Sequence, residues 1–236
     1  ETIASAESLA RLTADLADTS DDGCPVREAG ISQFVANVLE PGILATVECR
    51  QRIEATLAER AFTTVYQPVV HLPSGEVAGC EALTRFQGAA SPDVWFAEAH
   101  RVGLGVALEL AAVEAALPGI EHLPEGMYVA VNAGPGMVSS TALRRLLERV
   151  DAGRVVVELT EHTHIDDYDD LRRSLGVLRS LGARVAIDDS GAGFASFAHI
   201  LKLAPDLIKL DRILTTGIDL DPVRRAMAAA LVGFAT

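Results

Sequence analysis

From about residue 61 onward, short apolar runs alternate with amphipathic segments of helical periodicity. The apolar runs predict strands at 63–70, 76–84, 127–132, 154–159, 184–188 and 206–210. The segments between them predict helices at 92–101, 105–117, 141–150, 167–180, 193–202 and 222–235. Strands that alternate with helices are typical of parallel sheets, because a crossover helix returns the chain to the same end of the sheet. The sequence therefore predicts an α/β fold.

The first 60 residues contain no convincing strand. Apolar residues recur there at helical spacing in three segments, and Pro41 marks the start of the third one. Such stripes are more often a packed or dimerising face than a ligand site. We therefore predict a helical connector, or the end of an upstream module, at 1–60 and a separate domain at 61–236.

The charge balance excludes several kinds of partner. The chain has 20 Lys and Arg against 33 Asp and Glu, a formal net charge of −13. Because a chain this acidic has no general attraction for polyphosphate backbones or anionic lipid, we expect neither polymeric nucleic acid nor a membrane as a partner. The longest uncharged stretch, 126–143, contains Asn132, Gly134, Pro135 and Gly136 and does not fit a membrane span. Three widely spaced cysteines without a CxxC pair indicate a reducing compartment, and we expect a cytoplasmic protein.

Polar residues occupy the same relative position on five of the predicted strands, at or near the end of each apolar run. They are Glu81, Asn132, Glu158, the pair Asp188 and Asp189, and Lys209. In a parallel barrel all strand carboxyl ends lie on one face, which is where that fold builds its sites. A single such carboxylate would be read as a helix cap or a loop residue, but five strands with this feature indicate a common site.

The chemistry of these side chains narrows the kind of site. The four carboxylates and the amide are hard oxygen ligands, which suit Mg²⁺ or Mn²⁺ and do not suit Zn²⁺ or copper. Carboxylates crowded together repel each other unless cations are present, and one or two divalent ions would resolve that repulsion. Two such ions are the usual apparatus for in-line hydrolysis of a phosphodiester.

Two basic residues fit the same chemistry. Lys209 could orient a water molecule, take its proton or clamp a phosphate oxygen; the alternative is a structural ion pair with Asp211 or Asp188. Arg85, four residues after Glu81, could grip a phosphate with two parallel hydrogen bonds.

The ordered motifs from about residue 62 to the end of the chain resemble the EAL domain of bacterial cyclic-di-GMP phosphodiesterases. They are QPVV (67–70), EALTR (81–85), VAVN (129–132), ELTE (158–161), DDSGAGF (188–194) and IKLDR (208–212). The resemblance implies a modified TIM barrel and Mg²⁺- or Mn²⁺-dependent hydrolysis of cyclic di-GMP to linear pGpG.

The resemblance also implies a role for individual residues. Metal ligands would be Glu81, Asn132, Glu158 and Asp188, with Asp189 at a second metal position. Lys209 would activate the water, and Glu161 would hold the loop after the paired aspartates; with Glu81 these form the expected catalytic set. Substrate contacts would come from Gln67, Leu83 and Arg85.

The sequence departs from the EAL pattern in two places. Ser190 follows the paired aspartates where the family often has Phe, and this change is minor because Gly191 and Gly193 remain. Beyond the helix at 222–235 the family has further strands, one of them ending in a metal-site glutamate, which this sequence does not contain. Six strands cannot close an eight-stranded barrel, so we expect an open edge. A missing C-terminal part and a defective fragment are both compatible with this, and the apolar ending favours the first.

Two interpretations of function follow. The first is a cyclic-di-GMP phosphodiesterase whose N-terminal helices link it to an upstream sensory domain or help it to form a homodimer; the full set of site residues favours it. The second is a catalytically weak EAL module that acts as a receptor for cyclic di-GMP or binds a protein partner; the absent strands favour it. An unrelated metal-dependent barrel enzyme is a third alternative, which predicts no affinity for cyclic di-GMP.

Overall fold

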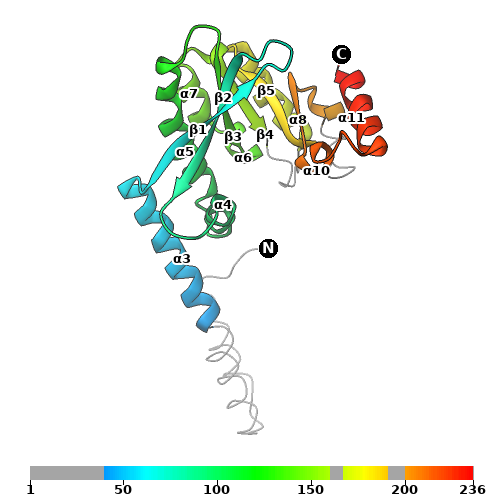
Figure 1. Ribbon diagram of the computed structural model, residues 1–236. Helices are drawn as coiled ribbons and strands as arrows, with labels where there is room; N and C mark the ends of the chain where they lie inside the picture. The colour runs from blue at the N-terminus through cyan, green and yellow to red at the C-terminus, as the bar shows by residue number, and fades with distance from the viewer. Residues whose placement is uncertain (1–39, 160–166, 191–199, 236) are drawn as a thin grey trace, which may run out of the picture. The chain divides into compact units, whose positions relative to one another are not determined.

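A computed structural model of the chain describes residues 40–159, 167–190 and 200–235 (Figure 1). The residues from Cys49 onward form one compact unit, which contains the sheet. The described part of the preceding unit belongs to helix α3 (Glu40–Glu59), which Pro41 was predicted to open.

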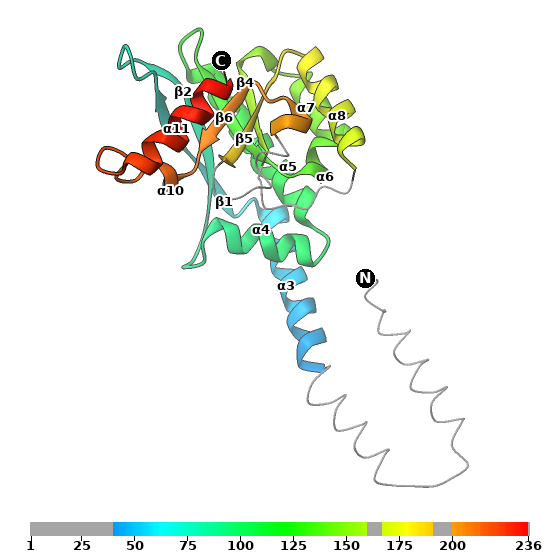
Figure 2. The same ribbon diagram turned by 90° about the vertical axis from the view of Figure 1, so that its right-hand side faces the viewer.

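Six strands form a single sheet in the order β1 to β6 along the chain (Figures 1 and 2). They are β1 (Phe62–Val70), β2 (Val77–Phe86), β3 (Tyr128–Ala133), β4 (Val155–Leu159), β5 (Arg184–Ser190) and β6 (Leu207–Leu210). All six agree with the predicted strands to within two residues at either end. In the described part of the chain β1 and β6 are the edges of the sheet, as expected for six strands.

The predicted parallel arrangement holds for β2 to β6 but not for β1. Strand β1 pairs antiparallel with β2, and Gln67 lies directly opposite Glu81. The connection between the two strands is only residues 71–76, and a parallel crossover needs a dozen residues or more. The short connection therefore forces a hairpin at the start of the domain.

Helices connect the parallel strands, as the periodicity predicts. The connecting helices are α4 (Pro92–Arg101), α5 (Gly105–Ala116), α6 (Pro135–Val138), α7 (Thr141–Leu147) and α8 (Tyr168–Ser180), with 3-10 turns at Leu117–His122 and Ala152–Arg154. Helices α10 (Arg212–Thr215) and α11 (Pro222–Ala235) follow β6. Of the helix predicted at 193–202, only residues from 200 onward are described, and these are helical to 203. Within the described ranges, none of the helices has the length and apolar character that a membrane crossing requires.

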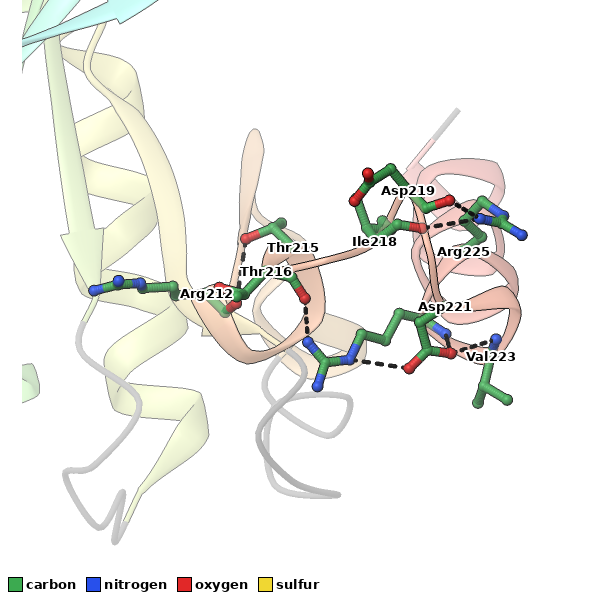
Figure 3. Close-up of polar contacts among 9 residues, drawn as sticks. Arg212, Thr215, Thr216, Ile218, Asp219, Asp221, Val223 and Arg225 are labelled. Atoms are coloured by element: carbon green, nitrogen blue, oxygen red, sulfur yellow. Dashed lines mark hydrogen bonds and ion pairs between the residues drawn. The ribbon is translucent and has the colours of Figure 1, made fainter.

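Aspartates fix the starts of two helices by accepting backbone hydrogen bonds. The carboxylate of Asp167 accepts from the backbone N–H groups of Asp169 and Asp170, both at 2.9 Å, at the start of α8. Asp221 accepts from the backbone N–H groups of Arg224 at 3.2 Å and of Val223 at 2.8 Å at the start of α11 (Figure 3). These bonds lower the pKa of each aspartate below its ordinary value, because they stabilise the charged form.

The two faces of β3, β4 and β5 have different surroundings. On one face, buried valines and Ile187 pack against leucines of α7 and α8, forming the main core. On the other face, Ala130, Val156 and Ala186 form a small buried cluster against Tyr128 and Leu207. Since side chains alternate along a strand, the residues two positions further along belong to this second face. They are Asn132, Glu158, Asp188 and Lys209.

Candidate functional site

Five adjacent strands each contribute one polar side chain to the same face of the sheet. Glu81 is on β2, Asn132 on β3, Glu158 on β4, Asp188 on β5 and Lys209 on β6. The register places Asn132 directly opposite Glu158, and Glu158 opposite Ala186, two residues before Asp188. The structure thus brings together the side chains that the strand ends predicted.

Lys209 contacts three carboxylates at once. Its Nζ lies 2.7 Å from Glu158 Oε2, 3.1 Å from Asp188 Oδ2 and 3.3 Å from Glu81 Oε2. Asn132 closes the group on the other side, where its Nδ2 donates a hydrogen bond of 3.2 Å to Glu81 Oε1. One oxygen from each of the three carboxylates lies within 4.8 Å of the others. Of the two ion pairs proposed as the alternative for Lys209, the structure contains the one with Asp188.

Burial controls the charge state of the cluster. Glu158 is only 5% exposed, and burial raises its pKa to about 7 although the Lys209 ammonium opposes the shift. Burial alone would lower the pKa of Lys209, but Glu158, Asp188 and Glu81 outweigh it and hold that pKa above its ordinary value. Lys209 therefore stays charged, and ionisation of Glu158 adds a negative charge beside it.

The donor set fits a hard divalent cation. Three carboxylates and one amide, with no thiol or imidazole among them, are the ligands that Mg²⁺, Mn²⁺ or Ca²⁺ prefers. The backbone of Asp189 belongs to β5, but its side chain lies outside the described part of the structure. Glu161 and the glycines at 191 and 193 also lie outside the described residues.

A cavity of about 1010 Å³ opens beside the cluster. It forms where two strands separate: the pairing of β2 with β3 ends at Ala82 and Val131, whereas β2 continues to Phe86 paired with β1. Its lining includes Glu81, Asn132 and Asp188 from the cluster, Leu83 and Arg85 from β2, and Phe96, Ala112 and Val113 from α4 and α5. This volume is at the upper end of the range for small-molecule sites.

The three residues expected to contact substrate differ in their positions. Leu83 and Arg85 line the cavity, and Arg85 is exposed with one guanidinium N–H donating to the Thr84 carbonyl at 3.0 Å. Gln67 is not part of the cavity lining, but it pairs with Glu81 across β1 and β2, so the two residues share a face.

Sequence reasoning missed a second polar group at the cavity. Glu109, on α5, is 8% exposed, and its Oε1 lies 2.7 Å from Nε2 of His100 on α4. Both residues line the cavity. The available signal was a glutamate next to Leu108 and four positions before Val113, because that spacing puts it on the same face as buried apolar residues of the helix.

Comparison with known proteins gives the family of the chain. The model of the EAL domain matches residues 50–236, so the chain belongs to the EAL domain family. An uncharacterised protein of Sinorhizobium fredii, y4lL, is 32% identical over 73% of this chain and 23% of its own length. The cyclic di-GMP phosphodiesterase PA2567 of Pseudomonas aeruginosa is 27% identical over 78% of this chain and 33% of its own. The chain thus spans a third or less of the length of these two relatives.

Solved structures show the same fold. The manganese and cyclic-di-GMP complex of Klebsiella pneumoniae BlrP1 is 28% identical, with a TM-score of 0.63 over 73% of this chain and 46% of that one. The cyclic-di-GMP complex of the PaMucR phosphodiesterase is 25% identical, with a TM-score of 0.67 over 79% of this chain and 81% of that one. The predicted TIM-like fold class of the EAL type is therefore confirmed.

Proposed function

We propose that this chain is the catalytic module of a cyclic-di-GMP phosphodiesterase, which hydrolyses one phosphodiester bond of cyclic di-GMP to give linear pGpG. The observation that carries the proposal is the convergence of Glu81, Glu158, Asp188 and Lys209 at one side of a cavity large enough for a dinucleotide. The cyclic-di-GMP phosphodiesterases among the relatives and the complexes among the structural neighbours support the same substrate.

In this proposal Glu81, Asn132, Glu158 and Asp188 hold Mg²⁺ or Mn²⁺, and Asp189 serves a second ion. When bound there, the cations would supply Lewis-acid activation of water and of the phosphodiester. Manganese in the BlrP1 complex and the hard oxygen donors of this cluster support such a site. Glu161, by resemblance, supports the loop that follows Asp189.

The remaining roles belong to basic and apolar side chains of the chain itself. Lys209 orients the attacking water or clamps a phosphate oxygen as an ammonium, and the contacts of its Nζ with all three carboxylates, within 3.3 Å, support this role. Arg85 at the cavity surface grips a phosphate, and Leu83 contacts the substrate beside it. Gln67, opposite Glu81, approaches the substrate from β1.

The proposal also covers the cellular location, the oligomeric state and the upstream domain of the enzyme. We place it in the cytoplasm as a homodimer, with an upstream sensory module that precedes α3. The greater length of the relatives supports further domains in proteins of this kind, since the chain covers 23% of one relative and 33% of another.

The direct test separates an enzyme from a receptor. The purified chain is incubated with cyclic di-GMP in Mn²⁺, Mg²⁺ or EDTA, and pGpG is followed by chromatography, while binding is measured by calorimetry in Ca²⁺. Turnover that requires the metal supports the phosphodiesterase. Binding without turnover would instead support the receptor, and absence of both would contradict the substrate.

A further inference from the structure

Helix α5 carries a buried carboxylate that the proposed reaction does not use. Glu109 is one of three buried polar or charged residues in the described chain, with Thr56 and Glu158, and its neighbours on the helix are apolar. Both of its oxygens are engaged. Oε1 contacts His100 Nε2 at 2.7 Å, and Oε2 accepts a hydrogen bond of 3.1 Å from the backbone N–H of Gly134. Burying a carboxylate costs free energy unless the group is hydrogen-bonded, so we looked for a structural role that these two contacts serve.

The bond to Gly134 lies just beyond the point where β2 stops pairing with β3, while β4 pairs with β3 as far as Ala133. The pairing of β2 with β3 ends at Val131, so the residues after it have no strand partner on the β2 side. A buried backbone N–H needs an acceptor, and Glu109 supplies one for the residue that follows β3. Gly134 comes two residues after Asn132, which donates to Glu81 in the carboxylate cluster. Glu109 thus supports the strand end that carries Asn132.

The glycines around the pair show how closely it is packed. A Cβ at position 134 would lie 2.9 Å from Glu109 Oε1, and a Cβ at position 105 would lie 2.2 Å from Nδ1 of His100. Neither position can carry a side chain unless the pair moves. The pair is therefore fixed against the turn on one side and against the first residue of α5 on the other.

We propose that His100 and Glu109 form a positioning pair that fixes the turn after β3 and thereby sets the Asn132 side chain within the metal site. The inference rests on the proposed function, because it requires that the cluster bind a divalent cation. Groups that orient a metal ligand through a hydrogen bond commonly change metal affinity by ten- to a hundredfold when they are removed. Neither residue contacts the carboxylate cluster itself in any described hydrogen bond or ion pair.

The test measures Mn²⁺ affinity by calorimetry, with thermal unfolding in EDTA as a separate readout. Glu109→Ala removes the acceptor for Gly134 and is expected to weaken Mn²⁺ binding by about tenfold. Glu109→Gln keeps an acceptor oxygen and should restore most of the affinity. The matched control is Glu114→Ala on the same helix, where an exposed glutamate pairs with Arg60 away from the cavity. This control should bind Mn²⁺ like the wild type.

A second variant changes the Gly134 partner of the Glu109–Gly134 hydrogen bond instead of Glu109. Gly134→Ala leaves Glu109 in place but pushes its carboxylate away, so it should weaken Mn²⁺ binding by itself and add little in the Glu109→Ala background. It also tests the proposal if Glu109→Ala does not fold. Normal Mn²⁺ affinity in both single variants, with only the melting temperature lowered, would overturn the positioning role. A wild type that binds no Mn²⁺ would overturn the proposed function, and this inference with it.

Discussion

Lys209 Nζ and Glu158 Oε2 lie 2.7 Å apart although β5 separates the strands that carry them. The ammonium reaches across Asp188 of the intervening strand and also contacts Glu81. It is therefore an internal counter-ion for three carboxylates, at the place where the donor set fits a divalent cation. In the metal-free protein Lys209 balances part of the charge that a metal would otherwise balance.

The first prediction concerns stability without metal. Lys209→Met leaves the carboxylates facing each other with no ammonium between them and is expected to lower the free energy of unfolding in EDTA by about 1–3 kcal/mol. This loss of stability is smaller than the loss expected for a fully buried ion pair, because the Lys209 side chain is 32% exposed. Urea titration measures it. Lys202→Met is the control, since Lys202 lies over the Tyr168 ring and not in the cluster. A Lys209→Met protein as stable as the wild type in EDTA would contradict the counter-ion role.

The second prediction concerns pH. The pKa of Glu158 is raised to about 7 in the metal-free protein, and a metal ligand must be deprotonated. A proton competes with the cation below that pKa, so Mn²⁺ affinity should fall as pH falls, by roughly tenfold from about pH 8 to about pH 6. Calorimetry in buffers of different ionisation enthalpy reports the proton released on binding. Affinity that is independent of pH over this range would disprove the competition.

The third prediction separates substrate binding from chemistry. Arg85→Ala removes an exposed cation from the cavity lining and is expected to raise the KM for cyclic di-GMP by about tenfold with a smaller change in kcat. Lys209→Ala should show the opposite pattern, with kcat falling more than substrate affinity. Arg101→Ala on α4 is the control, because Arg101 pairs with Glu98 and does not line the cavity. Equal effects on KM and kcat in the two site variants would argue against these separate roles.

Most of the fold could be predicted from the sequence because each strand is a short apolar run bounded by polar residues. Asn132, Glu158 and Asp188 each follow a short continuous apolar run, and the parallel arrangement of β3 to β5 brings such positions together. The antiparallel β1 did not follow from the alternation of strands and helices, because it depends on the length of one connection. The roles of Glu161 and Asp189 stay predictions.

Glu109 could not be recognised in the same way. Whether a glutamate on a helix is buried depends on which face packs against the sheet, and the helix around it is apolar on almost every side. Its partners are also distant in sequence, with His100 nine residues before it and the Gly134 amide 25 residues after it. The Gly134 N–H needs a side-chain acceptor because β2 has already separated from β3 at Val131.

In the proposed reaction, the carboxylate cluster holds the metal for hydrolysis of cyclic di-GMP. The most direct measurement is the rate of pGpG formation in saturating Mn²⁺ for the wild type, Glu158→Gln and Glu148→Gln. Glu158 is buried in the cluster, whereas Glu148 forms a surface ion pair with Arg144. We expect wild-type turnover for Glu148→Gln and a loss on the order of a hundredfold or more for Glu158→Gln, because the second change removes a metal ligand. Turnover of Glu158→Gln at the wild-type rate would rule out a metal site at this cluster.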